Sequence, residues 1–450
     1  MKSIPLFWAA IVAGALLCAD TVLAAPASVA TGTPWVIEVD EPTLLADPAL
    51  LHQAMVAAIQ ANDIAGMQVL LPVYEKLPHP DPILLAHTRA VDARAQGKPE
   101  AASRHYRDLL RRHPDAHGAR LRLAESLIEN REYAEARQQL AQLPSSGLSE
   151  EARRRIARHQ QLIDRHDSWS WEAGARLFYD ANVNNAPNRR HVGNWTFDMP
   201  RDDHGIAWHA GAAKLWPLPE GRSLMLTADL HGKHYFHLHD YRDMSFRLAF
   251  GPGHANLRRS LHLAPFIEYR LVGGQAYSHT VGLRAQWDRY WTPSLQSLVA
   301  LEAGRQKHHT RSYLDNRNHL ASIALVYRPN AAQHAVFGVD AYREWGTRHP
   351  SDSGHLYSFR AAWAKVWPAG PGLGIQVNAG TRRYQGPTLL SGGHNRRDHI
   401  LGACASLWHR RISHAGFTPR LTLSQQRTRS NDTLQGWRKR QLQVEVSRVF

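Results

Sequence analysis

The chain has 450 residues, which is too long for one average domain, and its formal net charge of +15 makes it strongly basic. Basic chains often bind nucleic acid, but the start of this chain indicates export. We therefore expect no nucleic-acid partner, and anionic lipids or an acidic client protein instead. Only two cysteines are present, Cys18 and Cys404. Cys18 lies in the expected leader, which excludes an internal disulfide in the mature chain.

The first 24 residues have the features of a cleaved signal peptide. Lys2 supplies the positive start, residues 4–17 form the apolar core, and cleavage is expected between Ala24 and Ala25. The apolar run is shorter than the ~20 residues that a spanning helix needs. A buried N-terminal helix is the alternative. Leu17 stands where lipoprotein processing at Cys18 would require a small residue, so we expect no lipid anchor, and residues 25–48 read as a linker.

Residues 49–166 predict a periplasmic α-solenoid of tetratricopeptide-like repeats. Two windows align with a period of about 34 residues, and a weaker copy covers residues 49–80. The pattern places small residues where helices touch and large ones between repeats, as in Ala90, Gly97, Ala102, Tyr106, Pro114, Ala124, Leu127, Tyr133, Ala136 and Leu140. Residues 150–165 read as a capping helix. The alternative is a plain helical bundle that binds nothing.

From residue 168 to residue 450 the hydrophobic period changes from 3.6 to 2, which predicts a 14-stranded antiparallel outer-membrane β-barrel. Fourteen alternating segments begin near Trp169, Ile206, Ser223, Tyr241, Leu261, His279, Leu295, Arg317, Gln333, Gly354, Gly372, Arg396, Ala415 and Gly436. Short and long connections alternate between them, as periplasmic turns and outer loops do. An even strand number returns both ends to the periplasm. A large two-sheet sandwich is the soluble alternative.

Side chains along these segments suggest how the barrel would be oriented. Aromatic residues near segment ends resemble interfacial girdles, namely Trp216, Tyr235, Trp291, Trp345, Trp367 and Trp408. A charge facing lipid at mid-bilayer costs ~2–4 kcal/mol, so charges on the polar face should face the lumen. These are Asp229, Glu268, Arg270, Glu302, Asp340, Glu344, Arg360, Arg382 and Arg420. They either line a path or form an ion-pair lattice that stiffens the barrel. The terminal Phe450 resembles a barrel-insertion signal.

Motifs for catalysis or cofactor binding are missing from the sequence, so we expect a protein that is not an enzyme and has no cofactor or metal. Residues 180–184 begin like a calcium loop, but Asn185 replaces the glycine and His191 the bidentate glutamate of such loops. A polar outer loop fits better. The histidines His231, His237 and His239 share a segment, yet alternate strand positions are ~7 Å apart, too wide for one small ion. They indicate a solvated basic rim.

The combination of signal peptide, tetratricopeptide-like repeats and C-terminal barrel resembles the surface lipoprotein assembly modulator (Slam) family. The run from Phe178 to Pro187, FYDANVNNAP, is similar to that family's sequence after its first strand. The resemblance implies a translocator that moves lipoproteins or secreted haem-carrier-like clients across the outer membrane. The helical part would engage the client and the barrel would conduct it. The expected partners of such a barrel also include barrel-insertion machinery, outer-membrane lipids and periplasmic chaperones. The resemblance carries no catalytic residues.

Two other functions remain open from the sequence. One is an exopolysaccharide export channel with a periplasmic repeat arm, although such channels usually carry many more repeats. The other is a passive porin or an adhesin whose helical part anchors it. The identity of the adjacent gene separates these functions, because a lipoprotein or haemophore-like client there favours translocation and a glycan synthase favours polysaccharide export.

Overall fold

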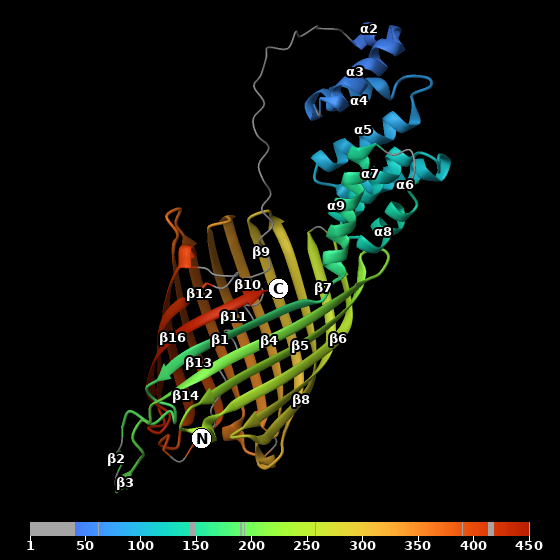
Figure 1. Ribbon diagram of the computed structural model, residues 1–450. Coiled ribbons are helices and arrows are strands. Elements are labelled where there is room, and N and C mark those ends of the chain that lie inside the picture. The colour runs from blue at the N-terminus through green and yellow to red at the C-terminus, as the bar shows by residue number, and fades with distance from the viewer. Residues whose placement is uncertain are drawn as a thin grey trace.

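The computed structural model describes residues 41–449 except positions 62, 145–148, 190, 193, 257, 347, 389 and 413–417. A helical stack comes first in the chain and a closed β-barrel follows (Figure 1). The predicted signal peptide, its cleavage site at Ala24 and Ala25, and Phe450 lie outside the described residues. Among the helices described, none combines the length and apolar character needed to cross a bilayer.

The helical part stacks antiparallel pairs of helices. Its elements are α2 (Glu41–Ala46), α3 (Pro48–Gln60), α4 (Ile64–Tyr74), α5 (Pro82–Ala95), α6 (Pro99–Arg112), α7 (His117–Glu129), α8 (Tyr133–Ala141) and α9 (Glu150–Asp167). Helix α2 lies within the expected linker 25–48, so helical structure begins earlier than predicted. The reason is that Leu44 and Leu45 pack on the first repeat's apolar cluster.

Local sequence determines where these helices start and how they pack. The Asp47 and Asp81 side chains cap α3 and α5, and a proline follows each cap at the first helical position. The expected small and large repeat positions form one buried cluster that contains Ala90, Ala102, Tyr106, Ala124, Leu127, Ala136 and Leu140. The Tyr106 hydroxyl also lies 2.7 Å from Nδ1 of His87. The predicted repeat stack is confirmed.

Fourteen antiparallel strands form the barrel, in sequence order with β1 closing against β16. They are β1 (Ser170–Asp180), β4 (Asp203–Pro217), β5 (Arg222–Tyr235), β6 (Asp243–Ala255), β7 (Arg259–Val272), β8 (Gln275–Thr292), β9 (Leu295–His308), β10 (Asn316–Asn330), β11 (Gln333–Gly346), β12 (Gly354–Val366), β13 (Pro371–Pro387), β14 (Asn395–His409), β15 (Arg420–Ser430) and β16 (Trp437–Val449). The fourteen predicted strands are confirmed, with starts shifted by a few residues.

Short elements occupy several connections. A hairpin of β2 (His191–Val192) and β3 (Trp195–Thr196) follows β1, and 3₁₀ helices follow β5, β9, β11 and β14, as η1 (His239–Tyr241), η2 (Ser312–Leu314), η3 (Pro350–Asp352) and η4 (Arg410–Ile412). The connection from β14 to β15 is longer than the turn expected at Ser413 and His414, and those two residues lie outside the described part. The β2–β3 hairpin lies at the barrel end opposite the helices (Figure 1).

Alternation along the strands separates the two faces of the barrel wall. Apolar residues such as Leu301, Ile323 and Val339 are about half exposed on the outer face. Two of the aromatic residues predicted for the girdles are placed differently. Tyr235 is 3% exposed on the inner face, and Trp408 lies inside with its ring 4.5 Å from the Arg420 guanidinium. A shift of one residue along a strand reverses the face, so segment-end position alone could not assign them.

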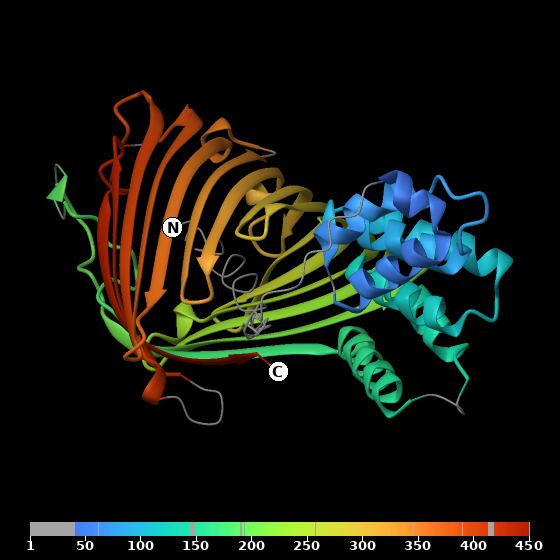
Figure 2. The ribbon, with the colours of Figure 1, turned by 90° about the horizontal axis from the view of Figure 1, so that it is seen from above.

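The helical stack contacts the rim of the barrel near β4, β7 and β8. Arg258 donates to the Gly97 carbonyl at 3.1 Å, and Asn256 to Glu100 at 3.2 Å. Lys214 donates to the Asp167 carbonyl where α9 leads into the barrel. Seen from above, the stack lies to one side of the barrel (Figure 2). The opening at this end is therefore flanked by the repeats.

Candidate functional site

The inner face of the barrel wall carries a network of paired charges. Nε of Arg247 on β6 donates to Glu268 at 2.9 Å, and its two terminal nitrogens donate to Glu302 at 3.0 Å. Arg284 on β8 also donates to Glu302, at 3.2 Å. Strands β6 and β9 are separated by β7 and β8, so side chains can join them only across the concave face. The network ties four strands together from inside.

A second group lies on β10 to β12. Arg360 pairs with Asp340 on the neighbouring strand and donates to Ser322 on β10 at 3.1 Å. Strands β10 and β12 are not neighbours, so this contact also crosses the concave face. Both groups consist of half-buried or buried charges whose partners lie on other strands. Such pairs lower the cost of keeping charge inside the wall.

Further charges cluster at the barrel end opposite the helices. Arg270 is 6% exposed and donates through Nε to Asp243 at 2.8 Å. Arg382 lies beside Tyr384, with its terminal nitrogen 3.3 Å from the hydroxyl. Arg396 lies over the same Tyr384 ring, with its guanidinium carbon 4.4 Å from the ring centre. Its Nε donates to Asp398 at 2.9 Å. Aromatic faces and carboxylates thus surround these arginines.

The other expected lumen-facing residues lie outside these groups. Asp229 lies opposite Arg247 in register, without an ion pair to it within the described residues. Glu344 lies near the outer end of β11, opposite Asn318. Arg420 is exposed at the other end of the barrel, over Trp408. Sequence reasoning did not select Arg247 or Arg284, although both alternate with apolar residues in the same way as the residues that were selected.

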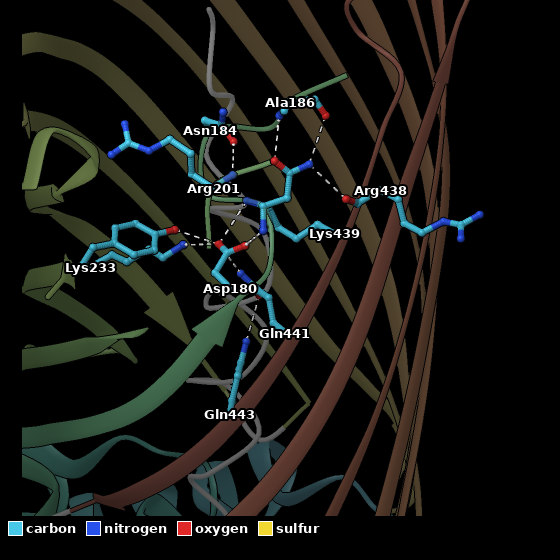
Figure 3. A network of polar contacts seen from close by, with 11 residues as sticks. Asp180, Asn184, Ala186, Arg201, Lys233, Arg438, Lys439, Gln441 and Gln443 are labelled. Atoms are coloured by element: carbon cyan, nitrogen blue, oxygen red, sulfur yellow. Dashed lines mark hydrogen bonds and ion pairs between the residues drawn. The ribbon is translucent and has the colours of Figure 1, made fainter. Parts of the chain in front are cut away.

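A fully buried carboxylate, Asp180, lies at the end of β1 (Figure 3). It accepts hydrogen bonds from the Tyr235 hydroxyl at 2.8 Å and from Gln441 at 2.9 Å. The ammonium groups of Lys439 and Lys233 lie at 3.2 and 3.4 Å. These partners come from β5 and β16, on either side of β1. One carboxylate therefore links strands across the junction of the first and last strands.

The asparagine-rich segment after Asp180 turns inward. The Asn182 amide accepts from the Ala186 nitrogen at 2.8 Å and donates to the Arg438 carbonyl at 3.2 Å. Asn184 bridges to the far side of the loop, accepting from the Arg201 nitrogen at 3.0 Å (Figure 3). Val183 packs with Phe178, Ala207, Tyr235 and Leu238. Since Phe178, Ala207 and Tyr235 belong to the inner face, this segment occupies the interior near the outer end.

These contacts bear on the two metal hypotheses. Two lysine ammonium groups stand beside the Asp180 carboxylate, where a calcium loop would place the cation. His237 and His239 lie beyond the end of β5, and Nδ1 of His237 is 2.8 Å from Asp203. Among the described residues, no group of three or more His, Cys, Asp or Glu side chains has an arrangement that could hold a metal ion.

In the helical stack, one buried acid connects the last repeat to the capping helix. Glu125 on α7 pairs with Arg155 on α9, and its carboxylate lies 3.4 Å from Nε2 of His159. Burial alone would raise the pKa of Glu125. The hydrogen bond from His159 and the positive charges of Arg122 and Arg155 outweigh burial and lower the pKa to about 2. Glu125 is thus ionised at neutral pH and holds α9 against the stack.

Comparison with known proteins gives matches along both parts of the chain. The family profile described as "Surface lipoprotein assembly modifier" covers residues 169–450, and that of its N-terminal TPR repeats covers residues 37–140. The chain is 36% identical over 413 residues to the surface lipoprotein assembly modifier of Moraxella catarrhalis, covering 91% of this chain and 82% of the relative.

Two further relatives give the same result. Surface lipoprotein assembly modifier 1 of Neisseria meningitidis serogroup B is 36% identical over 422 residues, which cover 92% of this chain and 86% of the relative. The Pasteurella multocida protein is 30% identical over 430 residues, covering 90% and 84%. With its closed 14-stranded barrel, this is an outer-membrane protein. The chain belongs to the surface lipoprotein assembly modifier family.

Proposed function

We propose that this protein moves lipoproteins, or soluble secreted clients of similar chemistry, across the outer membrane to the cell surface. The observation that carries the proposal is a repeat stack of the peptide-holding kind joined directly to the rim of a barrel with a charged inner face. The family's name, which refers to the assembly of surface lipoproteins, supports the same function. The helical stack lies in the periplasm and the client passes from it to the barrel.

The contacts at the rim explain how the stack assists transfer. The hydrogen bonds of Arg258 and Asn256 hold the repeats beside the opening. A client bound to the repeats is then kept close to the barrel, and its effective concentration there rises without any new contact to the barrel itself. This arrangement separates two tasks: the repeats hold the client and the barrel admits it.

The inner charges suit a path for a polypeptide. Arg247 and Glu268 are about one-fifth exposed as side chains, and each is neutralised by a partner on another strand. Paired charges hydrate the path but leave little net charge that would trap a passing chain. The nine residues predicted to face the lumen are proposed to line this path. The same pairs also stiffen the wall, and the two roles are compatible.

Other partners follow from the route the protein itself takes. We propose cleavage after Ala24, delivery by periplasmic chaperones, and recognition of Phe450 by the barrel-insertion machinery. Outer-membrane lipids then surround the apolar outer face. No step of this route requires a catalytic residue of this chain.

Removing residues 49–165 tests the division of labour. The barrel from residue 168 should still insert, because its strands are intact, while surface display of a co-expressed client lipoprotein should fall. The measurement is surface-exposed client per cell, normalised to inserted barrel and to total client. A matched variant, Tyr106→Ala with Leu140→Ala, should lower display less. It loosens the repeats without deleting them, since each large-to-small core change costs ~2–5 kcal/mol.

Deletion of the whole protein provides the decisive comparison. Surface client should then fall at least as far as with the truncated form. If the amount of surface client is the same with and without the protein, translocation is the wrong function. The export-channel and passive-pore functions would then replace it.

A further inference from the structure

Basic side chains gather on the outer face of the barrel wall, at the ends of β9 to β16 farthest from the helical stack. We call this set the basic belt. It comprises Arg305, Lys307, Arg317, His319, Arg343, His355, Arg383, Arg397, His399, Arg427, Arg429, Arg438 and Arg440. Each belt residue alternates with an inward-facing neighbour, as Arg397 does with Asp398 and Arg383 with Arg382.

Strand register brings like charges of the belt into direct opposition. Arg317 faces Arg305 across β10 and β9, and Arg383 faces Arg397 across β13 and β14. Arg427 faces Arg438 across β15 and β16. Directly opposed like charges destabilise a sheet. Their repetition along one rim therefore suggests an anion that lies between them.

The acidic side chains of these strands do not supply that anion. All acidic residues of β9 to β16 lie at inward positions, namely Glu302, Asp340, Glu344, Asp398 and Glu445. Among the residues that the structure describes, the arginines of the belt make no ion pair with an acidic side chain. Arg343 instead lies over the Trp345 ring, 4.0 Å from its centre. Positive charge on this face is thus uncompensated.

The belt occupies one side of the barrel. Within the strand bounds, the corresponding outward positions of β4 to β7 carry no arginine or lysine, although Arg242 directly precedes β6; examples are His204, His234, Phe246 and Tyr269. A general preference for basic residues at a membrane surface would place them around the whole circumference. The restriction to β9–β16 indicates a localised binding surface.

Shallow apolar grooves lie directly beneath the belt. One is lined by Ile323, Val339, Phe359 and Leu401, and it ends at His399 of the belt. It is hollow because small residues, Ala321, Ala341 and Ala379, stand between these large side chains. A neighbouring groove ends at His319, Arg343 and His355 in the same way. The basic side chains at the end of each apolar groove are complementary to a lipid whose anionic headgroup lies next to its acyl chain.

We propose that the basic belt binds the phosphate groups of an anionic glycolipid of the outer leaflet, with an acyl chain in the groove below. Arginine binds phosphate through paired, charge-assisted hydrogen bonds, and one phosphate can accept from two opposed guanidinium groups. That contact turns the repulsion between Arg383 and Arg397 into a bridge. A client protein is the less suitable occupant, because the belt faces lipid and lies outside the path through the barrel.

The test uses the purified full-length protein in neutral detergent, stripped of lipid and titrated with bisphosphorylated lipid A. Bound lipid per protein is counted by native mass spectrometry. The variant Arg383→Gln with Arg397→Gln should weaken binding about tenfold or more, since two charge-assisted contacts are lost. Dephosphorylated lipid A should bind the unmodified protein as weakly as phosphorylated lipid A binds the double variant. Added salt should weaken binding of the phosphorylated form.

A matched control removes two charges from the same outer face at the opposite rim. Arg222 and Lys365 lie there, Lys365 beside Trp367, and replacing both with glutamine should leave lipid A binding unchanged. Heat-modifiable gel migration verifies that each variant is folded. Equal affinity of the belt variant and the unmodified protein would overturn the proposal, as would equal weakening by the control. Loss of surface client with unchanged lipid A binding would also overturn it and assign the belt to the client.

Discussion

Replacing Asp180 with alanine should destabilise the barrel, because it leaves two ammonium groups without their shared carboxylate. Asp180 is fully buried, and the side chains of Lys439 and Lys233 are 10% and 32% exposed. Removing one partner of a buried pair costs ~3–5 kcal/mol. Since Lys233 keeps some contact with water, we expect the lower end, about 3 kcal/mol. That corresponds to about a hundredfold change in the ratio of folded to unfolded protein.

The assay is urea unfolding of the refolded protein in detergent, followed by tryptophan fluorescence, together with the temperature at which the folded gel band disappears. A triple variant, Asp180→Ala with Lys233→Met and Lys439→Met, is the control. It removes the stranded charges, and apolar replacement of a buried ion pair is often neutral. The triple variant should therefore recover most of the stability that the single variant loses.

Two outcomes would refute this reasoning. A change below about 0.5 kcal/mol for Asp180→Ala would be that of an ordinary surface substitution. It would mean that the cluster does not hold the junction of β1 with β16. A triple variant as unstable as the single one would show that the stranded ammonium groups are not the cause. The loss would then come from the hydrogen bonds of Asp180 to Tyr235 and Gln441.

Three other predictions concern the repeats and the loops. Burial, with nearby arginines, lowers the pKa of His87 to about 4 from its usual 6.5. The unfolded chain therefore binds the proton more readily, and the stability of the repeats should fall as the pH falls from about 6.5 to 4. The variant His87→Gln should reduce this pH dependence in circular dichroism melts. Tyr106→Phe, which removes the hydroxyl 2.7 Å from His87, should cost about 1 kcal/mol in the same melts. In a Cys404→Ala background, Ser312→Cys should react with impermeant maleimide on intact cells and Ser294→Cys should not, and the reverse pattern would overturn the assigned topology.

Much of the fold could be predicted from the sequence because it depends on periodicity. A period of 3.6 and the small residues at Ala90, Ala102, Ala124 and Ala136 reflect helices that touch, and these residues are fully buried. A period of 2 reflects a wall with two different faces. Both patterns are local, so a single chain displays them. Helix α2 was missed because six residues are too few to show a period, and its position depends on contacts with α3 and α4.

Less of the candidate site could be predicted, because pairing depends on register between distant segments. The sequence separates inward from outward charges, but not which of them meet. Asp180 and Lys439 are 259 residues apart and lie together only because β16 closes on β1. The register of β1, β4 and β5 determines the place of Tyr235 in the same way. Its place at the end of a segment resembled that of a girdle aromatic, whereas the structure points its hydroxyl at Asp180.

Charge segregation connects the two proposals made for this barrel. The acids of β9 to β16 all lie on the inner face, where Glu302 and Asp340 pair with arginines of other strands. Among the described residues, the arginines of the basic belt form no ion pair with an acidic side chain. The inner face is thus electrically balanced, which suits passage of a chain, while the outer face is not, which suits retention of an anion. A charge-reversing change should then act differently by face. Arg360→Glu should repel Asp340 and destabilise the wall, whereas Arg397→Glu should not lower stability in detergent, because the new carboxylate would face Arg383.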